Sequence, residues 1–265
     1  MSHTVHELGR EAEVAREAAR AAGEIVTGYF QRSPKSWEKS EDHPVTAADL
    51  EANQAIIEII SKALPGDAIL SEEAIDNPER LAHERVWVCD PLDGTKEFMA
   101  GIPEFAISIA LTHSGVPIVG VVYQPLSDEC FLAERGHGAY LNEEALLVST
   151  VGKLEDAQVL ASRTESSRGQ LDSYESWVRE FIPMGSVALK LARIAAGDSD
   201  LWLSAVPKSE WDVCAGDLLV REAGGVFATS DDGERGYNAR DPKLLAPMAA
   251  GPRALVDDFL ARCRA

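Results

Sequence analysis

The chain has 265 residues, of which 45% are hydrophobic, and a formal net charge of -19 at pH 7. This length and composition suffice for a large hydrophobic core, and the acidic charge argues against a nucleic-acid partner, which needs a basic face. The sequence has no apolar run of about 18 residues and no basic, apolar leader, so we expect a cytoplasmic protein with no membrane partner.

Two amphipathic helices are predicted at the start of the chain. Apolar residues recur at helical spacing over residues 5–31, and the pattern ends before Pro34. The second helix is expected to begin after Thr46 and to end before Pro65. Asp49 follows Thr46 at the spacing of a capping box, which is typical of a helix start.

Short apolar runs separated by Gly, Pro and Asp predict strands in the next part of the chain. These runs cover residues 68–70, 86–89, 106–111, 118–123 and 130–133. Because short turns join consecutive strands, we expect an antiparallel sheet packed on the two helices, in an α+β arrangement.

Helical and strand patterns alternate after about residue 150. Strands are predicted at residues 159–161, 201–203 and 226–228, and helices at 187–196, 212–223 and 254–262. We therefore divide the chain into an α+β subdomain, residues 1–150, and an α/β subdomain, residues 151–265.

The four cysteines lie far apart, with no C-x-x-C pair and no histidine at metal-binding spacing. They are Cys89, Cys130, Cys214 and Cys263. We expect free thiols in a reducing compartment.

The segment from Asp90 to Thr95 (DPLDGT) follows the strand predicted at residues 86–89. It offers two carboxylates, a backbone carbonyl and a hydroxyl, and oxygen atoms are the ligands that Mg2+ prefers. The amides of Gly94 and Thr95 are suited to hold a phosphate oxygen. The same residue types form ordinary surface turns, so this segment alone leaves both interpretations open.

Three other acidic positions lie at predicted ends of strands or helices: Glu72, Asp49 and Asp212. Each has a structural alternative. Asp49 would cap its helix, Asp212 would complement a helix dipole, and Glu72 with Glu73 would be a solvated pair.

Four motifs, in matching order over nearly the whole chain, resemble those of the inositol monophosphatase superfamily. They are residues 45–49 (VTAAD), 70–73 (LSEE), 87–95 (WVCDPLDGT) and 210–216 (EWDVCAG), the last closing on residues 222–225 (EAGG). The resemblance implies a layered αβαβα sandwich with the site between two subdomains, which agrees with the α+β and α/β halves. It also implies inhibition by lithium.

The resemblance implies two or three Mg2+ ions, held mostly by residues of the first subdomain. Glu72, Asp90 and the Leu92 carbonyl would hold one ion, and a second would be held by Asp90, Asp93 and Asp212. These ions would offset the acidic charge that repels an anionic substrate.

Asp49 and Thr95 are the catalytic residues implied by the resemblance. They would orient and deprotonate the attacking water, and no phosphoenzyme would form. A catalytically silent relative is another interpretation, but every expected ligand position is filled.

Three segments resemble the 3'(2'),5'-bisphosphate nucleotidase branch of the superfamily. They are residues 96–98, residues 162–164, and Gly185-Ser186 with Lys190. A bisphosphate nucleotide brings a second phosphate that needs a cation, and Lys190 would supply it. The alternative for Lys190 is a lysine on the helix surface. The full expected substrate-binding set is Glu72, Asp93, Gly94, Thr95, Gly185, Ser186, Lys190 and Asp212.

Two positions depart from the patterns of the two branches. Glu165 stands where the nucleotidases usually have histidine, and Ala205 replaces an acidic residue of the inositol phosphatases. Because these departures affect both branches, the three nucleotidase-like segments decide the prediction: hydrolysis of 3'-phosphoadenosine 5'-phosphate, with inositol 1-phosphate or a related sugar phosphate as the alternative. The roles of Glu165 and Lys39 and the formation of a homodimer are left open.

Overall fold

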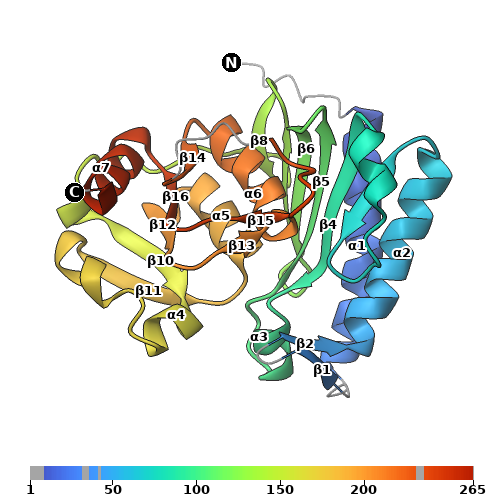
Figure 1. The fold of residues 1–265 in the computed structure, drawn as a ribbon, viewed down its shortest axis with the longest axis horizontal. Coiled ribbons are helices and arrows are strands. Elements are labelled where there is room, and N and C mark those ends of the chain that lie inside the picture. The colour runs from blue at the N-terminus through green and yellow to red at the C-terminus, as the bar shows by residue number, and fades with distance from the viewer. Residues whose placement is uncertain (1–8, 32–35, 41–42, 231–235, 265) are drawn as a thin grey trace.

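The structure is a computed structural model that describes residues 9–31, 36–40, 43–230 and 236–264. Five layers alternate helix and sheet across the molecule (Figure 1). They run from α1 (Arg10–Phe30) and α2 (Ala47–Ala63) at one end to α7 (Arg253–Arg264) at the other.

The first sheet has seven strands in chain order, and helices α1 and α2 cover one of its faces. Its strands are β3 (Ala68–Ser71), β4 (Arg85–Asp93), β5 (Ala106–His113), β6 (Val116–Gln124), β7 (Glu129–Glu134), β8 (Gly138–Leu141) and β9 (Glu144–Ala145). Neighbouring strands are antiparallel, as predicted, except that β3 and β4 are parallel.

Helices α5 (Val187–Ala195) and α6 (Glu210–Glu222) form the central layer, between the two sheets. Both are buried on most sides because a sheet lies on each face of the layer. Gly120 in β6 permits the close approach of α6, since a Cβ atom there would lie 2.9 Å from the Ala215 carbonyl oxygen.

The second sheet has five strands in the order β11-β10-β12-β16-β14 and packs between the central helices and α7. They are β10 (Gln158–Ser162), β11 (Glu180–Met184), β12 (Leu201–Ser204), β14 (Val226–Thr229) and β16 (Met248–Gly251). Strands β11, β10 and β12 are parallel, and β16 is antiparallel to β12 and β14.

The remaining elements are short. They are β1 (Ser36–Ser40), β2 (His43–Thr46), α3 (Thr95–Met99), α4 (Arg163–Ser167), β13 (Lys208–Ser209), β15 (Lys243–Leu244), and the 3-10 helices Pro78–Ala82, Leu154–Asp156 and Asp172–Trp177.

Within the described residues the predicted helices and strands are present; residues 5–8 of the first predicted helix lie outside them. Strand β4 continues to Asp93 instead of ending at Cys89, because β5 pairs with both Asp90 and Asp93 across a bulge. Strands β8, β9, β11 and β16 of the two large sheets, and the short elements outside these sheets, have no counterpart among the predicted elements. The division at residue 150 stays a prediction, although the first sheet precedes this residue and the second follows it.

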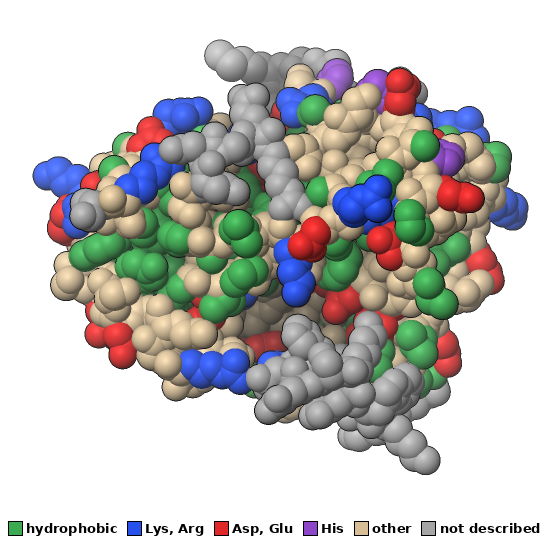
Figure 2. All heavy atoms as spheres, viewed as in Figure 1, with side chains coloured by type: hydrophobic (Ala, Val, Ile, Leu, Met, Phe, Trp, Pro, Cys, Tyr) green, Lys and Arg blue, Asp and Glu red, His purple; other side chains and the backbone are tan. Residues whose placement is uncertain are grey.

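All four cysteines are free, as predicted. None of the helices in the described ranges combines the length and the apolar composition that crossing a bilayer requires. Figure 2 shows basic side chains interspersed among acidic ones over the face drawn, with hydrophobic side chains gathered on the half that holds α7. The protein therefore carries Lys and Arg side chains on this face despite its acidic net charge.

Candidate metal centre

A cavity of about 580 Å3 lies where the end of β4 meets the first turns of α5 and α6. Most of the residues predicted for the site line this cavity. They are Glu72, Asp90, Leu92, Asp93, Gly94, Thr95, Gly185, Ser186, Lys190 and Asp212. The fold thus brings together residues that are up to 140 positions apart in the sequence (72 to 212).

Three carboxylates form the centre of the cavity. One oxygen atom from each of Asp90, Asp93 and Asp212 lies within 4.8 Å of the other two. Glu72 extends the group, because its amide donates to the Cys89 carbonyl and so places it beside Asp90. The set contains oxygen ligands alone, which fits a hard cation such as Mg2+.

The backbone of β4 explains how Asp90 and Asp93 come together. A bulge separates them, and the Leu92 amide donates a 2.9 Å hydrogen bond to Asp90 Oδ1. Gly94 then turns the chain into α3 with φ of 101°, and a Cβ atom there would lie 2.8 Å from the Glu104 carbonyl oxygen. Glycine is required at this turn.

Asp93 is tied to the beginning of α5. Its Oδ2 accepts 2.6 Å hydrogen bonds from the Ser186 hydroxyl and the Ala188 amide. The Ser186 hydroxyl, predicted to bind substrate, therefore donates to this carboxylate. The φ of Ser186 is 51°, which is unusual for a residue other than glycine. The Gly185 amide donates to Glu104 at 2.7 Å. The direct role of these two residues in substrate binding stays a prediction.

Asp212 belongs to the first turn of α6, where its Oδ2 accepts a 2.8 Å hydrogen bond from the Ser209 amide. Two residues earlier, the fully buried Glu210 accepts hydrogen bonds from the amides of Asn238 at 2.7 Å and Ala239 at 3.0 Å. The first turn of α6 is thereby anchored to residues 238–239.

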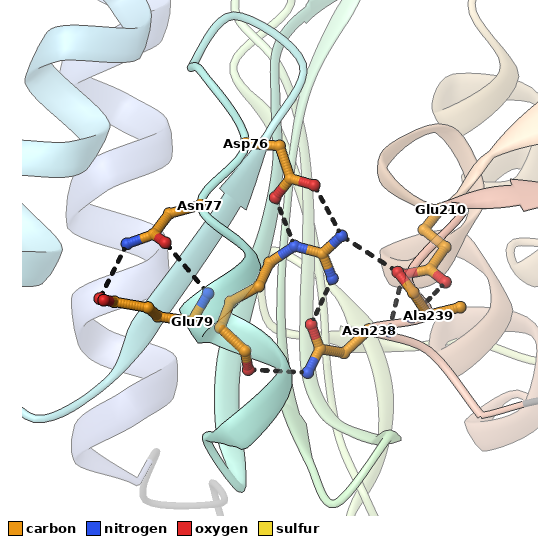
Figure 3. A network of polar contacts seen from close by, with 7 residues as sticks. Asp76, Asn77, Glu79, Glu210, Asn238 and Ala239 are labelled. Atoms are coloured by element: carbon orange, nitrogen blue, oxygen red, sulfur yellow. Dashed lines mark hydrogen bonds and ion pairs between the residues drawn. The ribbon is translucent and has the colours of Figure 1, made fainter.

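Arg80 connects this anchor to the segment between β3 and β4. Its guanidinium donates to Asp76 at 2.6 and 3.1 Å, to Asn238 at 2.6 Å and to the Ala239 carbonyl at 3.0 Å. In Figure 3, Asp76 lies on one side of the guanidinium and Asn238 and Ala239 on the other. The network links the chain that follows Glu72 to the helix that carries Asp212.

Arg80→Met is expected to weaken Mg2+ binding, because it removes the hydrogen bonds that connect the segment after Glu72 to the helix that carries Asp212. It should also lower the free energy of unfolding by about 1–3 kcal/mol, since it removes the hydrogen bonds that the buried Arg80 guanidinium donates. Calorimetric Mg2+ titration and urea unfolding would measure both effects. The matched control is Arg16→Met, whose ion pair with Glu13 is exposed and should contribute little. Unchanged Mg2+ affinity would contradict the positioning role of Arg80.

Asp49 and Thr95 form a hydroxyl–carboxylate pair beside the three-carboxylate centre. The predicted capping box is present: Asp49 Oδ2 accepts from the Thr46 amide at 2.8 Å and the Thr46 hydroxyl at 2.6 Å. Asp49 Oδ1 and the Leu92 carbonyl lie 3.0 and 3.1 Å from Thr95 Oγ1. Burial raises the pKa of Asp49, which makes its carboxylate a better proton acceptor. Capping and proton transfer are therefore compatible in one residue.

Burial also raises the pKa values of the central carboxylates. The pKa of Asp90 is raised by burial first and then by the charges of Glu72, Asp93 and Asp212. Burial, followed by the charge of Asp93, raises the pKa of Asp212 to about 7. A divalent cation would relieve this repulsion, so cations and protons compete for the centre.

Lys190 is 2% exposed, so the alternative of a helix-surface lysine is wrong. The reason is the central position of α5, which has a sheet on each face. The ammonium group donates to the carbonyls of Met184 at 3.0 Å and Gly185 at 3.1 Å. It therefore lies within the cavity wall, as a cation for an anionic ligand requires. The side chain of Lys39 lies outside the described residues.

Two groups of polar residues were not predicted. Lys208 lines the cavity and forms a 2.8 Å ion pair with Glu165. The Arg80 network is the other. Lys208 precedes Asp212 by four residues, which is a weak signal, and no spacing relates Arg80 to Asn238, 158 positions away.

Comparisons with known proteins find chains of similar sequence and fold. A model of the inositol monophosphatase family matches residues 8–256. A protein named Inositol-1-monophosphatase from Mesorhizobium japonicum is 37% identical over 231 residues, covering 82% of this chain and 85% of that protein. A protein named Nus factor SuhB from Pasteurella multocida is 37% identical over 229 residues, covering 83% and 85%. The crystal structure of extragenic suppressor protein suhB from Bartonella henselae superimposes with a TM-score of 0.84 at 30% identity, covering 96% and 98%. This similarity confirms the predicted layered fold.

Proposed function

Because the chain belongs to the inositol monophosphatase family, we propose that it is a Mg2+-dependent phosphatase that removes the 3'(2')-phosphate of bisphosphate nucleotides such as 3'-phosphoadenosine 5'-phosphate. Among the cations of the described residues that line the carboxylate-lined cavity, Lys190 and Lys208 are the two that are not exposed, and this observation carries the choice of substrate. An ester with one phosphate needs the metal centre alone. A second phosphate gives these cations a partner.

The donor set supports Mg2+ as the metal. Glu72, Asp90 and the Leu92 carbonyl would hold one ion, and Asp90, Asp93 and Asp212 another, with Asp90 shared. When bound, Mg2+ supplies positive charge that activates water and stabilises the developing charge on the phosphate and the leaving oxygen.

The chain's own residues bind and move the proton of the attacking water. Thr95 Oγ1 would accept this proton while passing its own to Asp49 Oδ1, 3.0 Å away. The two hydrogen bonds from Thr46 hold Asp49 in place for this transfer. The Ser186 hydroxyl and the Ala188 amide orient Asp93 in the same way. The attack needs no covalent intermediate.

Inositol 1-phosphate is the second candidate substrate. It is favoured by the 37% identity to the Mesorhizobium protein named Inositol-1-monophosphatase. Against it, Ala205 offers no side chain that could accept a hydrogen bond from a sugar hydroxyl, and the Glu165 carboxylate is already engaged by three donors.

The test is phosphate release from 3'-phosphoadenosine 5'-phosphate and inositol 1-phosphate, measured in parallel with saturating Mg2+. We expect kcat/KM to be at least about tenfold higher for the nucleotide, because each charge-assisted hydrogen bond to the second phosphate contributes about 1.5–3 kcal/mol. Phosphate release should be lost on chelation. A preference for inositol 1-phosphate would exclude the nucleotide as the natural substrate and leave the metal chemistry intact.

A further inference from the structure

Glu165 and Ala205, the two positions that depart from the patterns of the family's branches, are in direct contact. Glu165 Oε2 accepts a 2.7 Å hydrogen bond from the Ala205 amide. Its Oε1 accepts from the Ser204 hydroxyl at 2.9 Å and from Lys208 Nζ at 2.8 Å. Both oxygens are thus engaged, and the residue is 2% exposed. Glu165 therefore holds the chain at residues 204–208 and neutralises part of the charge of Lys208, and it does not repel an anion as a free carboxylate would.

Lys208 keeps donors for a ligand. An ammonium group has three N–H donors, and within the described residues the hydrogen bond to Glu165 accounts for one of them. The side chain is 13% exposed and lines the cavity that contains Asp93 and Asp212. The ion pair with Glu165 anchors the ammonium group, so less side-chain entropy remains to be lost when an anion binds.

Lys190, which is 2% exposed, is a second cation in the same wall. Its two hydrogen bonds to the Met184 and Gly185 carbonyls leave one of its three donors for a ligand. Burial is the main reason why the pKa of Lys190 is lowered to about 8; the charge of Asp93 opposes this shift and the charge of Lys208 contributes to it. The charges of Lys190 and Lys208 repel each other, and an anion bound by both would relieve this repulsion.

We propose that Lys208, anchored by its ion pair with Glu165, is a specificity-determining residue that binds, together with Lys190, a second anionic group of the substrate. This rests on the proposed phosphatase function and adds which side chains, Lys208 and its anchor Glu165, would set the preference for an ester that carries a second phosphate. The metal centre binds the phosphate that is removed. The lysine pair binds the one that stays.

The test compares two substrates that differ by one phosphate: 3'-phosphoadenosine 5'-phosphate and adenosine 3'-phosphate. In Lys208→Met, kcat/KM for the bisphosphate is expected to fall at least about tenfold, the value of one charge-assisted hydrogen bond, and that for the monophosphate less than about twofold. Lys208→Arg, which keeps the charge, should restore most of the preference. Lys153→Met removes an exposed lysine elsewhere and is the control for net charge.

Inhibition by the product gives a second readout that does not depend on turnover of the bisphosphate. Adenosine 5'-phosphate carries the retained phosphate, so its inhibition constant should rise at least about tenfold in Lys208→Met, while that of adenosine stays unchanged. Equal losses on both substrates, or none on either, would overturn the proposal.

Failure of the proposed substrate is distinguishable from failure of this inference. If the wild-type protein cleaves inositol 1-phosphate and not the nucleotide, the same variants are compared on inositol 1-phosphate and inositol 1,4-bisphosphate. A selective loss on the bisphosphate would still support the role of Lys208, and an equal loss would exclude it.

Discussion

Asp90→Asn is expected to lower kcat at saturating Mg2+ by about a thousandfold or more, because metal ions contribute several kcal/mol of transition-state stabilisation. Asp90 is the proposed shared ligand and is 2% exposed. The amide keeps the shape of the side chain and the Oδ1 acceptor for the Leu92 amide. The loss of activity is therefore attributable to the charge and not to misfolding.

The same substitution should stabilise the metal-free protein. Asp90 is repelled by Glu72, Asp93 and Asp212, and burial adds to the cost of its charge. Removing that charge is expected to raise the free energy of unfolding in EDTA by about 1 kcal/mol or more, the value of one pKa unit.

Urea unfolding in EDTA and phosphate release in Mg2+ would measure the two effects in one preparation. Asp156→Asn, at an exposed position on the 3-10 helix Leu154–Asp156, is the control and should change neither. Full activity of Asp90→Asn, or a metal-free variant less stable than the wild type, would refute the proposed centre.

Removal of Mg2+ should make the stability of the protein strongly dependent on pH. The folded pKa of Asp212 is raised to about 7 from an unfolded value of 3.8, so the folded state binds its proton more tightly than the unfolded state. Stability therefore falls as pH rises between these two values and levels off above the folded pKa. The expected slope in this window is about 1.4 kcal/mol per pH unit for each such carboxylate.

Mg2+ should reverse this trend, because it replaces the protons and binds more tightly as they leave. At about 100 times its dissociation constant it adds about 2.7 kcal/mol. Urea unfolding from pH 5.5 to 8, with EDTA or Mg2+, would show both effects.

General repulsion among the acidic residues acts in the same direction as the carboxylate centre, so the pH slope must be compared with that of a variant. Asp90→Asn should flatten the slope in EDTA, and Asp156→Asn should not. A metal-free wild type whose stability rises with pH over this range would contradict the raised pKa values.

The elements that the sequence predicted well are those whose signals are local. The capping box of Thr46 and Asp49 needs three residues of separation, and the apolar runs that became β5 and β6 are bounded by turn residues. The short strands β8, β11 and β16 gave no such signal. Strand β16 lies between β12 and β14, and its pairing depends on residues distant in the sequence.

The residues of the candidate site also fall into those with a local sequence signal and those whose arrangement depends on distant residues. Asp90, Asp93 and Thr95 became candidates because one short segment carries their oxygen atoms, and Glu72 and Asp212 because all four motifs follow in the order of the family that the sequence resembles. The engagement of the Ser186 hydroxyl by Asp93 depends on where α5 begins relative to β4, and no local pattern encodes that.

By itself, the sequence predicted an α+β half and an α/β half from local patterns, and its ordered motifs predicted the layered fold, the carboxylate ligands and the hydroxyl–carboxylate pair through their resemblance to a family. The tertiary structure alone decided that Lys190 is buried, that Glu165 is paired with Lys208, and that Arg80 joins the two segments carrying Glu72 and Asp212. The physical reason is that burial and charge pairing depend on which elements pack together, and the partners lie 43 residues apart for Lys208 and 158 for Arg80.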